Sequence, residues 1–405
     1  MRNILVLNCG SSSVKYELMD IEKSDIIARG VVERIGMDEA VLHHHFKNGN
    51  DYVDIKKVKN IPTHRKAIKL IVDVLKNKKY GVIQGPDEIY GIGHRVVHGG
   101  EKYTKSVYVT EVVKQDIKDY IELAPLHNPH HLAGIEACED LIPEHPQVAV
   151  FDTAFHQTMP REAYMYALPY EYYKKYGIRK YGFHGSSHKY VSQRGAKILD
   201  RSLQDLKIIS CHLGNGASAC AVKNGNSVDT SMGFTPLSGL VMGTRTGDFD
   251  PAILLYIMNK EAYSASEINS LINRHSGLRG LSGISRDFRE IIEKYKKGSY
   301  RAKLAVDVFS YRLKHYIGAY TAIMNGLDVL IFTAGIGENS VELREMACAD
   351  LENMGIKLDK TKNIECNARE GIISSKDSKV KVMCIPTNEE LLIARETDSI
   401  IKQNE

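Results

Sequence analysis

The sequence has no tryptophan, only 11 prolines and 7 cysteines in 405 residues, and no long apolar run. The short apolar run at 4–7 cannot serve as a signal peptide, and no run is long enough to span a bilayer. The cysteines are odd in number, dispersed, and form no C-x-x-C motif, which is typical of reduced thiols in a cytoplasm. We therefore expect a soluble cytoplasmic protein with no membrane partner.

The chain also has no large excess of positive or negative charge. The chain has 54 Lys and Arg against 50 Asp and Glu, a formal net charge of +4. These charges are scattered, which argues against a nucleic-acid partner but is compatible with an anionic small molecule. The length favours two domains of roughly 150–200 residues each.

Several common catalytic motifs are missing. The patterns G-x-x-x-x-G-K-[ST], G-x-G-x-x-G and H-R-D do not occur, so the P-loop, dinucleotide and protein-kinase interpretations are excluded. Histidine is frequent, with 16 residues. However, no H-E-x-x-H motif and no Cys/His set with zinc spacing is present. A metal hydrolase is accordingly the weakest of the alternatives, and the histidines at 43–45 predict an exposed strand.

Three turns rich in glycine and serine follow predicted strands. The first, NCGSSSVKY at 8–16, contains S-x-x-K, a motif of serine acyl-enzymes. In those enzymes the serine opens a helix, whereas here the pattern is strand–turn–strand, so a phosphate-binding turn is favoured. A similar hairpin occurs at 207–222, and a third strand ends in G-I-G-E-N within 328–340. The repetition predicts an internal duplication.

The remaining pattern alternates strands and helices, which indicates an α/β fold. We expect helices at 64–79, 129–141, 187–200, 251–259, 301–325 and 341–353. Helix-start signals are Asp250 before Pro251, Asn339 with Glu342, and Thr387 with Glu390. The predicted domains are 1–152 with the C-terminal helix 387–405 packed back, and 153–386 for nucleotide binding.

Five residues could carry chemistry. Arg95 and Arg245 are flanked by glycines, which predicts turns where a guanidinium can bind phosphate or carboxylate. His184 lies in a glycine-flanked loop before a helix, where it could donate to a phosphoryl oxygen or simply be a satisfied buried histidine. Asp152 follows a buried strand, and Glu389 lies at a helix N-terminus, where it could bind Mg²⁺ or only compensate the helix dipole.

Ten runs then identify a family: NCGSSSVKY, HRVVHGGE, APLHNPH, VFDTAFHQTMP, YGFHGSSHKYV, HLGNGAS, DTSMGFTPLSGLVMGTRTGD, GISRDF, TAGIGENS and IPTNEELLIARET. In this order along the whole chain, they closely resemble the acetate kinase family. That family belongs to the acetate and sugar kinase/heat-shock/actin superfamily. The resemblance implies a duplicated two-domain, actin-like (ribonuclease H-like) fold with the active site in the interdomain cleft. It also implies a homodimer.

The resemblance further implies roles for individual residues. Asn8 and Glu389 match the magnesium site, Asp152 the catalytic aspartate, and His184 and Arg245 the groups that stabilise the transition state. Arg95 matches the residue that orients the carboxylate, and His127 lies close to the phosphoryl path. The pocket for the acetate methyl group corresponds to Val97, Leu126, Phe183 and Pro236. Nucleotide contacts correspond to Ser11, Ser13, Lys15, His212, Leu213, Gly214, Asn215, Gly216, Asp287, Phe288, Arg289, Gly335, Ile336, Gly337, Glu338 and Asn339.

The implied reaction is reversible transfer of the ATP γ-phosphoryl group to acetate, giving ADP and acetyl phosphate, with Mg²⁺ or Mn²⁺ as the metal. A propionate kinase or another short-chain carboxylate kinase remains an alternative. A non-metabolic, actin-like or chaperone-type ATPase is an alternative from another functional class.

Overall fold

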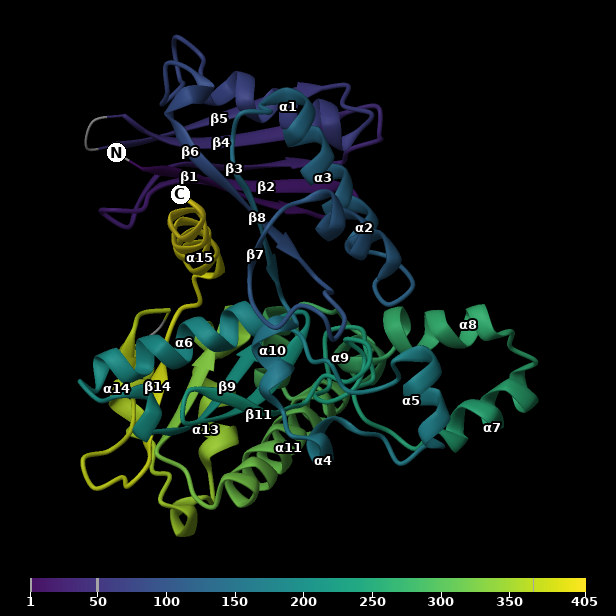
Figure 1. Ribbon diagram of the computed structural model, residues 1–405. Helices are drawn as coiled ribbons and strands as arrows, with labels where there is room; N and C mark the ends of the chain where they lie inside the picture. The colour runs from purple at the N-terminus through teal and green to yellow at the C-terminus, as the bar shows by residue number, and fades with distance from the viewer. Residues whose placement is uncertain (1, 49–50, 367) are drawn as a thin grey trace. The chain divides into compact units, whose positions relative to one another are not determined.

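The computed structural model describes residues 2–48, 51–366 and 368–405 (Figure 1). The chain forms two compact units, Met1–Ala154 with Asn388–Glu405, and Phe155–Thr387. The first unit ends at Ala154, two residues after the predicted 152, and its C-terminal part begins at Asn388, one residue after the predicted 387. Among the described residues, no helix is both long and apolar enough to cross a membrane.

The first unit is built on one mixed sheet with the order β5-β4-β3-β2-β1-β6-β8-β7. Its strands are β1 (Asn3–Cys9), β2 (Ser13–Asp20), β3 (Asp25–Glu33), β4 (Ala40–Asn48), β5 (Asp51–Lys59), β6 (Ile89–Val96), β7 (Val107–Tyr108) and β8 (Gln147–Phe151). The strands from β1 to β5 pair antiparallel, whereas β1, β6 and β8 run parallel.

Helices cover both faces of this sheet where β1 lies. The helices α1 (His64–Leu75), α2 (Glu111–Asp119) and α3 (Asn128–Leu141) belong to this unit, and α1 and α3 pack against each other and against β2 and β1. The C-terminal helix α15 (Glu389–Asn404) packs on β1, β6 and β8 (Figure 1). Burial on both faces explains why the run at 4–7 is uniformly apolar.

The second unit repeats this topology. Its sheet has the order β11-β10-β9-β12-β14-β13, with the same sequence of antiparallel and parallel pairs as β3-β2-β1-β6-β8-β7. The strands are β9 (Lys207–Leu213), β10 (Ala217–Lys223), β11 (Asn226–Thr230), β12 (Val329–Thr333), β13 (Gly371–Ile372) and β14 (Lys381–Cys384). The duplication and the α/β class expected from the sequence are confirmed, and β4 and β5 are an addition to the first unit.

The helices of the second unit are α4 (Arg161–Tyr164), α5 (Tyr170–Tyr176), α6 (Gly185–Ile198), α7 (Ala252–Glu261), α8 (Ala265–Ser270), α9 (Gly277–Ser282), α10 (Phe288–Lys296), α11 (Tyr300–Met324), α12 (Ala334–Asn339), α13 (Val341–Cys348) and α14 (Lys360–Glu365). Helix α6 packs on β9 and β12, and α11 packs on β10 and β9.

Three local expectations were wrong. The G-I-G-E-N segment is itself the helix α12, and the next helix is capped by Ser340, whose side chain accepts from Leu343 N, rather than by Asn339. The last helix is capped by Asn388 instead of Thr387. Within 43–45 only the outer histidines face away from the core, because alternation along β4 buries His44.

Candidate active site

The first predicted phosphate turn lies between β1 and β2. Asn8 and Lys15 are directly opposite partners in this antiparallel pair, so their side chains lie on one face of the sheet. The turn between them is closed by Gly10 N donating to Ser13 O at 2.7 Å, and Ser11 is exposed. The hairpin therefore presents an amide, an ammonium group and a serine near one end of the sheet.

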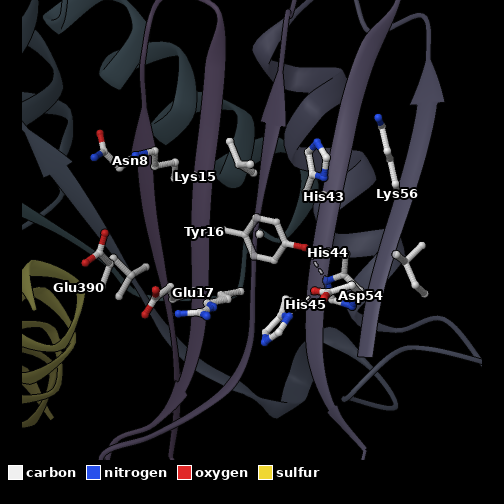
Figure 2. Close-up of a pocket in the computed structure, with 15 residues that line it drawn as sticks. Asn8, Lys15, Tyr16, Glu17, His43, His44, His45, Asp54, Lys56 and Glu390 are labelled. Carbon is white, nitrogen blue, oxygen red and sulfur yellow. Dashed lines mark hydrogen bonds and ion pairs between the residues drawn. The ribbon is translucent and has the colours of Figure 1, made fainter. Parts of the chain in front are cut away.

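Figure 2 shows the pocket that begins at this hairpin. It measures about 680 Å³ and extends over the open face of β2 to β5, past Glu17 and the outer histidines of β4, with Glu390 at its α15 side. Burial raises the pKa of Glu17 to about 7, and the charge of Glu390 acts in the same direction. The pocket thus combines both signs of charge.

An ion cluster of a buried aspartate and two half-buried residues lies at the carboxyl ends of β6 and β8. Arg95 Nη2 donates to Asp152 Oδ2 at 3.0 Å, and Arg95 Nε lies 3.7 Å from Glu389 Oε2. Burial alone would lower the pKa of Arg95, but Asp152 and Glu389 outweigh it and raise that pKa. Burial raises the pKa of the Glu389 carboxyl, although Arg95 opposes this effect. The three predicted residues do meet in this unit.

The remaining predicted residues of the first unit surround the start of α3. Val97 follows Arg95 closely and is 5 % exposed, whereas Leu126 is 64 % exposed. His127 directly precedes α3, and Asn128 fixes this end of the helix by donating to His98 O at 3.0 Å and accepting from His98 N at 3.2 Å.

In the second unit, His184 has the left-handed backbone conformation, with φ +57°, at the start of α6. A non-glycine residue in this region costs free energy and is often found at functional sites. Its Nδ1 lies 2.9 Å from Ser218 Oγ, and its ring stacks on His212 with 4.0 Å between centroids. His212 Nδ1 in turn lies 2.8 Å from Ser187 Oγ. The imidazole of His184 is thus held from two sides.

The other predicted arginine, Arg245, lies in the loop between β11 and α7. Its Nη1 donates to Pro236 O at 3.0 Å, so two predicted site residues meet here. Burial lowers the pKa of Arg245. Within the described parts of the chain, no carboxylate pairs with this guanidinium, which leaves its charge available to an anionic ligand.

Eight predicted nucleotide residues line one cavity of about 840 Å³ within the second unit. They are Gly214, Asn215, Asp287, Phe288, Arg289, Gly335, Ile336 and Asn339. This size suits a small-molecule ligand. Other predicted nucleotide residues lie outside it: Leu213 is fully buried in β9, and Glu338 turns its carboxylate to Thr387 N at 3.1 Å.

Sequence reasoning missed seven further residues of this cavity, namely Arg286, Ile292, Lys296, Ser340, Val341, Glu342 and Ile364. Ile292 and Lys296 follow Phe288 at intervals of four along α10 and therefore share its helix face. That spacing could have identified them. Ile364 comes from the distant helix α14, and no local signal indicates it.

The donor chemistry in the first unit suits a magnesium ion bound with a nucleotide. Asn8 offers an amide oxygen and Glu389 a carboxylate, and Mg²⁺ is usually held by one or two such groups plus phosphates and water. The described residues contain no cluster of three or more His, Cys, Asp or Glu side chains placed to hold a metal without such a substrate.

Comparison with known proteins extends over the whole chain. The model of the Acetokinase family matches residues 3–395. The chain is 56% identical over 399 residues to an acetate kinase of Halothermothrix orenii, covering 98% of this chain and 99% of that protein. It is 55% identical over 406 residues to an acetate kinase of Clostridium acetobutylicum, covering 99% of each.

Two solved structures have the same fold. The acetate kinase of Porphyromonas gingivalis has a TM-score of 0.95 and 48% identity, covering 99% of this chain and 100% of that one. A propionate kinase of Francisella tularensis has a TM-score of 0.91 and 45% identity with the same coverage. Because the family model matches residues 3–395 and the relative from Halothermothrix orenii is 56% identical over 98% of this chain, the chain belongs to the acetokinase family.

Proposed function

We infer that this chain is an acetate kinase, a phosphotransferase with a carboxyl group as acceptor. It catalyses ATP + acetate ⇌ ADP + acetyl phosphate, by direct in-line displacement at the γ-phosphorus. The observation that carries this inference is the 56% identity to an acetate kinase across 98% of the chain.

The main requirement of this reaction is positive charge around the two reacting anions. A carboxylic acid has a pKa of roughly 4, so acetate is already an anion at neutral pH and needs little help from a base. The difficulty is to hold one anion in line with another while charge spreads over the transferred group. Donors fixed in advance around that group are the main source of rate enhancement.

We assign this work to two arginines and a histidine. Arg245, which has no carboxylate partner within the described residues, is placed against the transferred phosphoryl group, together with His184. Arg95 orients the acetate carboxylate, with Val97, Leu126, Phe183 and Pro236 around the methyl group and His127 near the phosphoryl path. Asp152 accepts a hydrogen bond from Arg95 at 3.0 Å, so its proposed role is to position this arginine instead of accepting a proton.

For the nucleotide we propose two groups of contacts. The cavity of about 840 Å³ would hold the nucleoside part, since its walls combine Phe288 and Ile292 with backbone-exposing glycines. Lys15, Ser11, Ser13 and the turn after β9 would contact the phosphates. Asn8 and Glu389 would hold Mg²⁺, or Mn²⁺ in its place, which neutralises phosphate charge when bound. Whether the two groups meet in a cleft between the domains stays a prediction.

The decisive experiment traps the acyl phosphate with hydroxylamine, using purified protein, Mg-ATP and either acetate, propionate, butyrate or no acid. The expected result is a strong acetate-dependent hydroxamate signal that weakens with chain length. ATP hydrolysis that ignores the carboxylate would instead support the actin-like or chaperone-type ATPase. Hydrolysis that needs Zn²⁺ and forms no hydroxamate would support the metal hydrolase.

A propionate kinase is the second candidate, because the structure of one such enzyme aligns with a TM-score of 0.91. An apolar pocket discriminates one methylene by only ~1–3 kcal/mol, so propionate should be a usable but poorer substrate. A higher kcat/KM for propionate than for acetate would change the acceptor while keeping the mechanism.

We also propose that the protein is a homodimer in the cytoplasm. Helix α7 supports the first part: its sequence AILLYIMNKE is mostly apolar, yet none of its residues is buried. Such a face is usually covered by another protein surface. For the second part, all seven cysteines are free and buried, as expected where thiols are kept reduced.

A further inference from the structure

The loop that carries Arg245 lies directly on the backbone of the segment 272–279. The contact consists of main-chain bonds on both sides of the arginine, with one side-chain bond from Thr244. They are Leu278 N to Met242 O at 2.8 Å, Arg279 N to Gly243 O at 3.0 Å, Ser276 N to Thr244 O at 3.1 Å, Thr246 N to Ile272 O at 3.1 Å, and Thr244 Oγ1 to Asn273 O at 2.9 Å. The position of Arg245 therefore depends on this segment.

Part of the segment has an unusual conformation. Leu271–His275 winds as a π-helical turn between α8 and α9. Such turns are rare and occur frequently at functional sites. Here the carbonyls of Ile272 and Asn273 accept hydrogen bonds from Thr246 and Thr244. The turn thus supplies two of the acceptors that hold the arginine loop.

Gly277 makes the close approach possible. It has φ +64°, and a Cβ at this position would lie 2.2 Å from Met242 O and 2.6 Å from Arg245 O. Both atoms are backbone atoms, so they cannot turn aside as the end of a side chain can. Any larger residue at 277 must displace the peptide of Arg245 itself.

We propose that Gly277 and the π-helical turn Leu271–His275 position Arg245 for phosphoryl transfer, with Thr244 as the side-chain link. This inference rests on the role given to Arg245 in the proposed function. The guanidinium is attached through a flexible side chain, so its reach is set by where the backbone is held. A misplacement of about 1 Å in a group that stabilises a transition state can reduce the rate 10²-fold.

The test compares Gly277→Ala with Gly283→Ala. Gly283 ends the same short helix and has a similar φ of +67°, but a Cβ there meets only the end of the Arg301 side chain. Both variants therefore carry the same kind of backbone strain, and only the first touches the arginine loop. We expect Gly277→Ala to lower kcat by about 10²-fold with the KM for ATP nearly unchanged, and Gly283→Ala to keep kcat within roughly twofold.

A transition-state mimic separates positioning from a general loss of structure. Aluminium fluoride with Mg-ADP and acetate imitates the transferred phosphoryl group. In Gly277→Ala its inhibition constant should rise in parallel with the loss of kcat, while the dissociation constant of ADP stays the same. Equal kcat values in the two glycine variants, or a mimic that binds as tightly as in the unmodified enzyme, would overturn the proposal.

Thr244 provides a second test if Gly277→Ala fails to fold. Thr244→Val removes the bond to Asn273 O and should lower kcat several-fold, and Thr244→Ser should restore it. No loss in Thr244→Val, or no rescue by serine, contradicts the positioning role. Arg245→Ala serves as the reference. If that variant keeps its kcat, the proposed role of the arginine itself is wrong. If Arg245→Ala loses kcat but the Gly277 and Thr244 variants do not, only the positioning inference is rejected.

Discussion

Two arginines of similar sequence context have opposite surroundings in the structure. Arg95 is paired with the carboxylates of Asp152 and Glu389, whereas Arg245 contacts a backbone carbonyl of Pro236. Flanking glycines predicted that both arginines lie in turns and bind a ligand. The predicted turn is wrong for Arg95, which lies within strand β6, whereas Arg245 does lie in a loop. The partners of Arg95 could not be predicted, because Asp152 and Glu389 are distant from it in the sequence, whereas Pro236 lies in the same loop as Arg245. The first arginine is oriented by charge and the second by backbone packing, so the two should respond differently to substitution.

Arg95→Lys tests the first arrangement. Lysine keeps a positive charge near Asp152 and Glu389 but loses the planar fork that can hold a carboxylate with two parallel bonds. The KM for acetate should rise by about tenfold, since one charge-assisted hydrogen bond contributes about 1.5–3 kcal/mol, while the KM for ATP stays nearly constant. Steady-state kinetics with each substrate varied in turn checks this. An equal rise in both KM values would argue against a role in acetate binding.

Val97 should set the size of the acyl pocket. It is 5 % exposed, and replacement by alanine removes two methyl groups from the proposed wall around the acetate methyl group. The ratio of kcat/KM for propionate to that for acetate should rise by about tenfold, in the range that one methylene contributes. Val96→Ala is the matched control, because Val96 is fully buried in the core of the first unit. A ratio that is unchanged in Val97→Ala, or raised equally in the control, would remove Val97 from the pocket wall.

At the scale of elements, the sequence predicts repeated units well and irregular ones poorly. The hairpins β1–β2 and β9–β10 follow from an apolar run, a glycine-rich turn and a second run, and both are present. Helix α12 was missed because glycine is a poor helix former, and here packing against β9 and β12 overrides that local preference. The π-helical turn at 271–275 has no sequence signal of its own. Its carbonyls instead accept hydrogen bonds from the loop of Arg245, which is distant in the sequence.

Four buried histidines of the first unit make its stability depend on pH. One is His131, on α3, whose pKa burial lowers well below its usual value. Burial lowers the pKa of His44, on β4, and of His94 and His98, in and just after β6, to about 4 each. His44 Nε2 donates to Tyr80 O at 3.1 Å, and His94 Nε2 lies 2.7 Å from Gln147 Oε1, so both rings are satisfied in the neutral form. Below pH 6.5 the unfolded chain binds protons that the folded unit does not, and stability is lost as the pH falls toward 4.

The loss should be up to about 1.4 kcal/mol per pH unit for each of these histidines. Denaturant titrations followed by circular dichroism at about pH 7 and about pH 5 measure it. His94→Asn should reduce the dependence by the share of one histidine, whereas the exposed His315→Asn should not. Identical pH dependence in the unmodified protein and in His94→Asn would show that this ring does not titrate between the folded and unfolded states as expected.

At the scale of the whole molecule, the two units share one topology but differ in what was added to it. The first has β4 and β5, which form part of the wall of the pocket in Figure 2, and the second has α7 and α8 between β11 and α9. The duplication was predictable because it repeats along the sequence. The exposure of α7 could not be predicted, because an apolar helical run ordinarily predicts a buried helix.

Leu255→Asp tests whether α7 is the dimer surface. The side chain of Leu255 is 66 % exposed and that of Tyr256 is 64 % exposed, so an aspartate there removes no packing within the chain and the variant should fold. In a symmetric dimer the change occurs on both copies, and the loss of two buried leucines, each contributing about 1.5–3 kcal/mol, should weaken association by about 10² to 10⁴-fold. Analytical ultracentrifugation over a range of concentrations should therefore show a dimer for the unmodified protein and a monomer for Leu255→Asp. Val58→Asp, at a 54 % exposed position on β5, should leave the dimer intact. If Leu255→Asp sediments as a dimer, association uses another surface, and the apolar face of α7 must be covered in some other way.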